Sequence, residues 1–299
     1  MKNFLRGLKG YMMPIAMTVG VIFYEYAGYL TFLIPYLVFV MLLLTFSKLS
    51  WHNIRITRLH IWLVAIQIFG SLAVYLLFLP LNKIVAQAAL ICVLAPTATA
   101  APVITGMLSG NVESLTAYSL ISNLMVAVVS PLYFTLFGAG KDLSFFSSLL
   151  MIFQHVALLV VLPVLTAYVI KKTSNKLNGF LLKNNGVSFY LWSISLIIVS
   201  GKTMQFIMNQ SDANAHTEII IAVVAFWICL FQFLTGRRVG RIYDDTVAGG
   251  QGLGQKNTIL AIWMAQMYLH PLSSIGPGAY VLWQNVINSY QVWKKRKEL

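Results

Sequence analysis

The sequence predicts an all-α integral membrane protein with ten transmembrane helices. Three observations lead to this prediction: the composition, the apolar segments and the distribution of basic residues. Of the 299 residues, 59% are hydrophobic and only 10% are charged, whereas a soluble domain carries roughly 25% charged residues. The net charge of +13 would indicate nucleic-acid binding in a soluble protein. Here we assign it to basic cytoplasmic loops, and we expect the lipid bilayer as partner and no nucleic acid.

Ten segments are candidate membrane spans, because a helix needs about 20 predominantly apolar residues to cross the hydrocarbon core. They are residues 11–24, 30–46, 59–78, 84–108, 115–137, 145–170, 187–207, 219–234, 247–269 and 275–290. The first and last are short, and the fourth and ninth are interrupted by Pro, Gly and polar residues. The basic start of the chain is assigned to the first helix, since no small-residue cleavage site of a signal peptide follows it.

The basic residues test this count of helices. If the N-terminus is cytoplasmic, 17 of the 21 Lys and Arg residues fall on the cytoplasmic side. Only Lys83, Lys141 and Lys202 fall on the other side, and Lys256 lies within a span. Cytoplasmic loops are enriched in Lys and Arg. The bias therefore predicts a multi-pass protein of the cell (inner) membrane with both termini in the cytoplasm.

The two interrupted segments occupy matching positions in two halves of the chain, residues 1–137 and 138–299. Five helices per half would place the second repeat upside down relative to the first. The interruptions contain Pro96, Pro102, Gly250, Gly252 and Gly254. Matched interruptions are the best sequence indication of a transporter binding site, since the freed backbone groups must face protein, water or a ligand. The alternative is a pair of ordinary Pro and Gly kinks in structural helices.

These segments resemble those of a known family. Residues 96–102 read Pro-Thr-Ala-Thr-Ala-Ala-Pro and residues 252–257 read Gly-Leu-Gly-Gln-Lys-Asn. They are similar to the motifs Pro-Gly-Gly-Thr-Ala-Ser-Asn and Glu-Val-Gly-Met-Gln-Asn of the bile acid:sodium symporter family, whose bacterial members resemble the apical sodium-dependent bile acid transporter. A Gln in the third helix matches Gln67, and an Asn in the last helix matches Asn285. The resemblance covers nearly the whole chain.

The resemblance implies a two-domain architecture. Helices 1, 2, 6 and 7 would form a panel domain, and helices 3, 4, 5, 8, 9 and 10 a core domain. Helices 4 and 9 would be broken and would cross near the membrane midplane. The substrate would bind at the interface between the two domains.

The chain departs from the family at its two sodium sites. The positions that correspond to family sodium ligands include Ala101, Pro102, Leu115, Ser119, Gly252 and Lys256. Only Ser119 and the matching Gln67 still offer a side-chain oxygen. A hard cation requires several oxygen ligands, so we expect no bound metal and transport that does not depend on sodium. A sodium-coupled symporter with altered ligands remains an alternative.

Lys256 is the one charged residue in the middle of a predicted span, since Lys202 lies near the end of the seventh. Such a charge costs about 2.5–3.5 kcal/mol to insert and is functional by default. We expect its ammonium to replace a sodium ion and to contact the Gln67 oxygen and carbonyls freed in the ninth helix. Burial would favour its neutral form, which leaves proton coupling open. The alternative is that Lys256 extends to the membrane interface.

Eight polar residues form the candidate substrate and ion pathway. They are Gln67, Thr97, Thr99, Ser119, Gln255, Lys256, Asn257 and Asn285. By resemblance, Thr99, Asn257 and Asn285 fall at substrate-contacting positions. The alternative for the uncharged members is a hydrogen bond between helices.

The pattern as a whole favours a secondary transporter of a small organic anion that works by alternating access. A cation/proton antiporter of the same crossed-helix fold is the alternative, although such antiporters usually carry Asp at the crossing and none is present here. An intramembrane enzyme would need a nucleophile–base or metal constellation within the spans, and none is found. We therefore expect no enzymatic activity and no cofactor.

Overall fold

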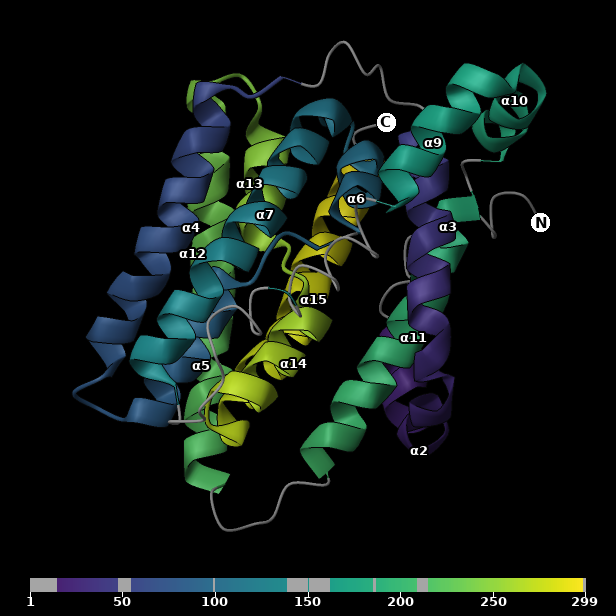
Figure 1. Ribbon diagram of the computed structural model, residues 1–299. Helices are drawn as coiled ribbons and strands as arrows, with labels where there is room; N and C mark the ends of the chain where they lie inside the picture. The colour runs from purple at the N-terminus through teal and green to yellow at the C-terminus, as the bar shows by residue number, and fades with distance from the viewer. Residues whose placement is uncertain are drawn as a thin grey trace.

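The computed structural model (Figure 1) describes residues 15–47, 55–98, 100–138, 150, 162–184, 187–208 and 215–297. Throughout these residues the regular structure is helical, apart from one isolated β-bridge. The prediction of an all-α protein is therefore confirmed for the part of the chain that the structure describes.

Three described helices are long and apolar enough to cross a membrane. They are α4 (Arg58–Phe78), α7 (Val112–Phe137) and residues His216–Ile242 of α12 (Ala215–Ile242). Their outer surfaces are apolar: Phe69, Leu132 and Phe231 are each more than half exposed. Contiguous apolar surface of this kind marks a membrane or partner interface. These helices identify the chain as a membrane protein, in agreement with its composition.

The other predicted spans correspond to helices that do not meet this combined criterion of length and hydropathy over the described residues. Residues 15–22 are helical and are followed by α2 (Tyr24–Ala27). The second span comprises a 3-10 helix, η1 (Gly28–Leu33), and α3 (Ile34–Phe46), and the seventh is α11 (Val187–Met208). The tenth is α15 (Ile275–Lys297), preceded by the 3-10 helix η5 (Pro271–Ser274).

The sixth predicted span, residues 145–170, lies largely outside the described residues. Its described end belongs to α9 (Leu162–Thr173). The count of ten transmembrane helices therefore stays a prediction.

One helix was not predicted. The basic connection after the sixth span contains α10 (Asn175–Lys183), which begins where the Ser174 hydroxyl accepts a hydrogen bond from the Leu177 N–H. Within this helix Leu181 is buried, while Leu177 and Phe180 are exposed. A helix of nine residues is too short for the span criterion, so this segment was interpreted as a basic loop.

The fourth span is interrupted as predicted. It consists of α5 (Lys83–Leu94) and α6 (Ala101–Met107). Ala95 leaves the helical conformation, with ψ at 138°, because the residue before a proline is disfavoured in the α region. Pro102 is the second residue of α6. Proline is tolerated in the first turn of a helix, because an N–H there would have no partner within the helix. The two prolines therefore end one half-helix and begin the next.

The ninth span is also interrupted, but not at its glycines. It consists of α13 (Thr246–Gly254) and α14 (Thr258–Tyr268). The prediction that Gly250, Gly252 and Gly254 form the break is therefore wrong, since all three belong to α13. Their role is close packing: a Cβ on Gly254 would overlap the Phe233 ring, and one on Gly252 would lie 2.8 Å from the Tyr118 ring. The break itself is formed by residues 255–257.

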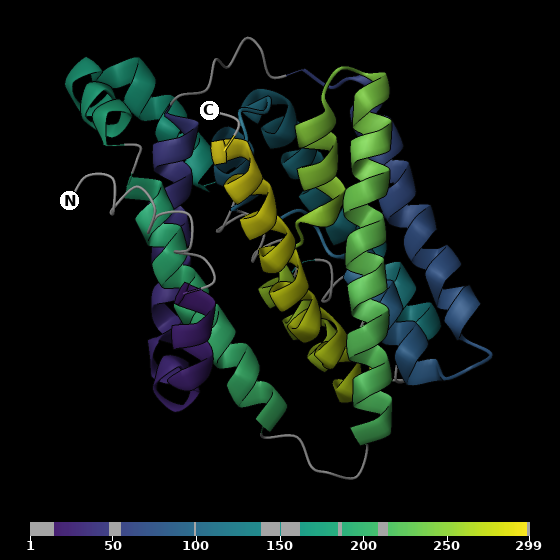
Figure 2. The ribbon, with the colours of Figure 1, turned by 180° about the vertical axis from the view of Figure 1, so that it is seen from behind.

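The helices form two groups that stand side by side (Figures 1 and 2). In the first group, α11 packs against α2, η1 and α3, and α9 packs against α3 and α10. In the second group, α4, α5, α7 and α12–α15 pack around the two interruptions. The groups contact each other where α3 meets α6 and where α11 meets α15. This boundary passes beside the crossing of the interrupted helices.

Candidate site at the crossing of two interrupted helices

The two interruptions pair with each other. Thr97 and Lys256 form an antiparallel β-bridge. The Ala98 N–H donates to the Gln255 carbonyl at 2.9 Å, and the Asn257 N–H donates to the Pro96 carbonyl at 2.8 Å. Backbone groups that leave a helix within a membrane must find partners inside the protein. Here each interruption supplies partners for the other.

Lys256 is buried at this crossing. Its side chain is 1% exposed, and its Nζ donates to the Val93 carbonyl at 2.8 Å. Val93 lies in the last turn of α5, where carbonyls lack helical partners and carry a partial negative charge. The ammonium thus caps the C-terminal end of α5. The alternative in which Lys256 extends to the membrane interface is wrong.

Gln67 caps the same helix end, but it is not the partner of Lys256. Its Nε2 donates to the carbonyls of Leu94 and Ala95, at 2.8 and 3.0 Å. Its Oε1 accepts from the hydroxyls of Tyr118 and Ser122, at 2.8 and 2.9 Å. The predicted contact between the Gln67 oxygen and the Lys256 ammonium is therefore wrong, because two hydroxyls of α7 occupy that oxygen.

The Lys256 ammonium was also expected to meet carbonyls of the ninth helix, and this is wrong too. The carbonyls at the end of α13 have other donors. The Thr97 hydroxyl donates to the Gly252 carbonyl at 3.0 Å, and the Tyr280 hydroxyl donates to the Gly254 carbonyl at 2.8 Å. The Lys256 side chain instead reaches across the crossing to α5.

The backbone N–H groups of the two bridged residues also have matching partners. The Thr97 N–H donates to the Ser122 hydroxyl of α7 at 3.2 Å. The Lys256 N–H donates to Oε1 of Gln284 in α15 at 2.8 Å, and Nε2 of Gln284 donates back to the Lys256 carbonyl at 3.3 Å. Each interrupted span thus receives a polar side chain from the helix that comes after it in the chain, which is α7 for the first span and α15 for the second.

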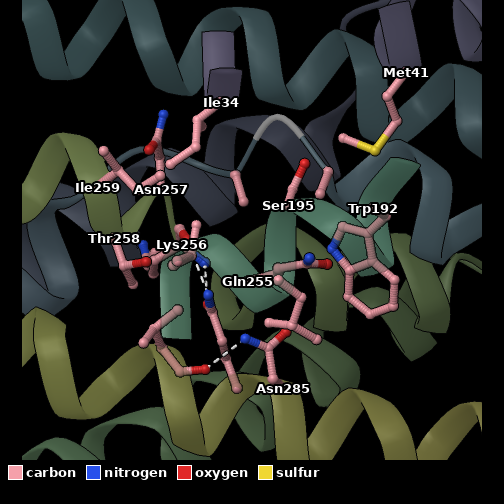
Figure 3. A pocket seen from close by; sticks show the side chains of 16 residues that line it. Ile34, Met41, Trp192, Ser195, Gln255, Lys256, Asn257, Thr258, Ile259 and Asn285 are labelled. Carbon is pink, nitrogen blue, oxygen red and sulfur yellow. Dashed lines mark hydrogen bonds between the residues drawn. The ribbon is translucent and has the colours of Figure 1, made fainter. Parts of the chain in front are cut away.

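A cleft lies beside the crossing, between the two groups of helices (Figure 3). It has a volume of about 80 Å³ and is partly open to solvent. Apolar side chains from α3 and α11 form one wall, and the crossing, α14 and α15 form the other. The polar lining residues are Ser195, Gln255, Lys256, Asn257, Thr258, Gln284 and Asn285. Among the described residues, no Asp or Glu lines it.

Gln255 presents to this cleft an amide whose oxygen has no partner among the described residues. It is 2% exposed, and within the described residues its Oε1 has no hydrogen-bond partner. Figure 3 shows the amide directed into the cleft on the side of Trp192. A buried amide without a partner costs stability, so its persistence at a cleft points to a ligand or a water molecule. Asn257, in contrast, uses its Oδ1 to cap α14 by accepting from the Leu260 N–H.

The predicted pathway residues divide into two sets. Gln255, Lys256, Asn257 and Asn285 line the cleft. Gln67 and Thr97 lie in the buried core behind the cleft, where their side chains hold helix ends together. This agrees with the alternative interpretation, in which uncharged polar residues form hydrogen bonds between helices. Thr99 lies outside the described residues.

Ser119 belongs with the second set. It is buried on α7, and its carbonyl accepts from Nδ2 of Asn123 at 2.8 Å. It is not among the residues that line the cleft. Among the described residues, no group of three or more His, Cys, Asp or Glu side chains could hold a metal ion.

No family model and no curated protein matches the chain. The resemblance to the bile acid:sodium symporter family therefore depends on the motifs quoted above.

Several functional side chains were missed in the sequence. Gln284 holds both backbone groups of Lys256, and Gln232 donates to the Cys92 carbonyl and to the Tyr280 hydroxyl, at 3.3 and 3.0 Å. Trp192 and Ser195 line the cleft from α11. A glutamine in an apolar span is itself a signal, because it must find a partner there. No comparable signal marks Trp192, since tryptophan is common at membrane interfaces.

Proposed function

We propose that this protein is a secondary transporter that carries a small organic anion by alternating access. The observation that carries the proposal is the paired crossing of two interrupted helices beside a cleft between two groups of helices. Interrupted helices at matching positions are a hallmark of transporter binding sites. Relative movement of the two groups would expose the cleft to one side of the membrane and then to the other.

An inverted repeat of five plus five helices is part of the proposal. Its support is the matched bonding on the two sides of the crossing. Thr97 and Lys256 occupy equivalent places, because each caps the opposite interrupted helix and each N–H is held by the next helix, α7 or α15. A two-fold axis between the two residues would produce this exchange. The group with α3 and α11 would then be the panel domain, and the group with α4–α7 and α12–α15 the core domain.

An anionic substrate is favoured by the charges at the cleft. Among the described residues its lining contains no Asp or Glu, and Lys256, which is positively charged when protonated, lies at the crossing. The N-terminus of α14 begins at the cleft with Asn257 and Thr258, and helix N-termini carry a partial positive charge. In an environment of low dielectric these charges attract an anion more strongly than they would in water.

Transport independent of sodium follows from Lys256. The Lys256 ammonium already holds the end of α5 at the crossing, which is a place where a bound cation would otherwise be stabilising. A second cation about 4 Å from it would be repelled by roughly 4 kcal/mol at an effective dielectric constant of 20. Coupling would then run through protonation of Lys256 or through exchange of substrates.

Labelling of a single cysteine tests alternating access. Cys92 and Cys229 are both buried and are first replaced by Ala, and Ser195→Cys is introduced in the cleft. A membrane-impermeant thiol reagent is applied to vesicles of either orientation, and counterflow uptake is measured with a panel of radiolabelled carboxylates and sulfonates. We expect labelling from both sides and protection by the anion that is taken up. Labelling from one side only, or no uptake of any anion, would contradict the proposal.

A further inference from the structure

A second groove lies on the core group, between α12 and α15. Figure 2 shows these two helices in contact at one end and diverging toward the end that carries the C-terminus of the chain. The groove has a volume of about 690 Å³ and is partly open to the surroundings. It shares no lining residue with the cleft at the crossing, and neither α3 nor α11 contributes to it. It is therefore a separate feature of the molecule.

The walls of this groove are apolar and open to the outside. Leu234 of α12 is 46% exposed, and Val286 and Tyr290 of α15 are 52% and 60% exposed. Phe233 and Val247 lie deeper in the groove. In a membrane-spanning region, an open apolar channel between two helices is a surface that lipid acyl chains cover.

Three basic side chains also line the groove. They are Arg237 of α12 and Lys294 and Lys295 of α15, and in the part of the chain that the structure describes no Asp or Glu lines the groove with them. Arg237 is held in place, because its Cγ occupies the space that a side chain on Gly250 would need. The planar guanidinium of arginine matches phosphate oxygens with two parallel hydrogen bonds. The cations therefore form a concentrated positive site next to an apolar channel.

Polar groups without partners lie next to this site. Gln291 lines the groove, and its Oε1 accepts from Nε2 of Gln251 at 3.4 Å. Nε2 of Gln251 also donates to Oδ1 of Asn288 at 3.0 Å. Within the described residues, Oε1 of Gln251 and Nδ2 of Asn288 are buried and have no partner. This cluster connects the groove to α13, the half-helix that leads into the crossing.

We infer that the groove binds one anionic phospholipid from the adjacent leaflet. Its acyl chains lie against Leu234, Val286 and Tyr290, and its phosphate is bound by the three basic side chains. Basic pockets between transmembrane helices bind lipid head groups in this way, and each basic residue near the surface contributes to the attraction. A zwitterionic phospholipid adds a cation of its own to the three already present, and it binds more weakly.

Native mass spectrometry tests this inference. The purified protein is equilibrated with equal amounts of phosphatidylglycerol and phosphatidylcholine, and the bound lipids are counted. The test variant is Arg237→Gln/Lys294→Gln/Lys295→Gln. The control variant, Lys183→Gln/Arg238→Gln/Arg241→Gln, removes the same charge from exposed positions outside the groove. We expect the wild type and the control to retain one phosphatidylglycerol, and the test variant to bind it at least about tenfold more weakly.

Two further experiments test the contributions of the acyl chains and of the phosphate separately. Val286→Trp narrows the apolar channel and leaves all charges in place, so we expect it to reduce phosphatidylglycerol binding as well. Inorganic phosphate tests a free anion as the occupant, and we expect it not to displace the lipid. The inference is overturned by equal retention of phosphatidylcholine, by equal loss in the two triple variants, by unchanged binding in Val286→Trp, or by displacement with inorganic phosphate.

Discussion

Thr97 and Lys256 pair with each other at the crossing, and each caps the carbonyl of the fourth residue before its partner. The Thr97 hydroxyl donates to Gly252 at 3.0 Å, and the Lys256 ammonium donates to Val93 at 2.8 Å. Each side chain therefore crosses to the interrupted helix that carries the other residue. The two helix ends are held by one reciprocal arrangement, in which a hydroxyl serves one end and a cation the other.

This reciprocity predicts that Thr97 and Lys256 are energetically coupled. Thr97→Val removes one hydrogen bond, which costs about 0.6 kcal/mol on average between membrane helices. Lys256→Met should cost more, since it leaves the Val93 carbonyl without its charged partner. In a double-mutant cycle, the unfolding free energies measured by denaturant titration in micelles should show a coupling of at least about 0.5 kcal/mol. Strictly additive losses would contradict a shared arrangement.

Gly252 should tolerate no side chain. A Cβ there would lie 2.8 Å from the Tyr118 ring, which is fully buried and held by Gln67. We expect Gly252→Ala to destabilise the protein by about 1–3 kcal/mol, as overpacking does. Gly179→Ala in α10 is the control, because nothing lies within 4 Å of its Cβ position. That change should be neutral or should raise the melting temperature, since Ala is the better helix former.

The sequence located the long helices and one of the two interruptions well. The spans of α4, α7 and α12 are continuous apolar segments, and the interruption in the fourth span follows from the local conformational restriction that Pro96 imposes. The ninth interruption lies at residues 255–257, within the segment predicted to be interrupted, but its glycines do not form it, because glycine has two uses in a membrane helix. It can end a helix, or it can let another chain approach, and the position of Phe233 that decides between them depends on the tertiary structure.

The sequence predicted which residues belong to the candidate site better than it predicted the contacts between them. A lysine within a span is conspicuous, and Lys256 does lie at the crossing. The hydrogen-bond partner of Lys256 could not be inferred, because it is the backbone carbonyl of Val93 and every residue carries such a carbonyl. For the same reason the sequence did not show that Gln67 and Thr97 cap helix ends while Gln255 faces the cleft.

Gln255 should contribute to substrate binding and not to stability. Its Oε1 has no partner among the described residues, so Gln255→Met should leave the melting temperature unchanged or raise it. Uptake should fall at least about tenfold if the amide binds substrate, which corresponds to about 1.4 kcal/mol. Gln87→Met is the contrast, since Gln87 donates to the Phe137 carbonyl at 2.7 Å and accepts from the His270 N–H at 3.0 Å. That variant should lower the melting temperature. The reverse pattern would exclude Gln255 from the site.

Both termini should lie in the cytoplasm. The prediction follows from the basic clusters at the two ends of the chain, because Lys and Arg near a span are retained on that side. A fluorescent reporter that matures only in the cytoplasm should be active when fused to the C-terminus. A periplasmic phosphatase in the same place should be inactive. Activity of the phosphatase alone would reverse the orientation.

The most direct test is uptake by purified protein in liposomes, with sodium replaced by choline at fixed pH. Because the Lys256 ammonium already occupies the crossing, we expect the rate of organic anion uptake to be the same in both media. Replacing Lys256 by Gln should abolish any dependence on a proton gradient. A steep loss of uptake by the unaltered protein without sodium, or a sodium ion within about 2.5 Å of the carbonyls at the ninth interruption, would contradict the proposed role of Lys256.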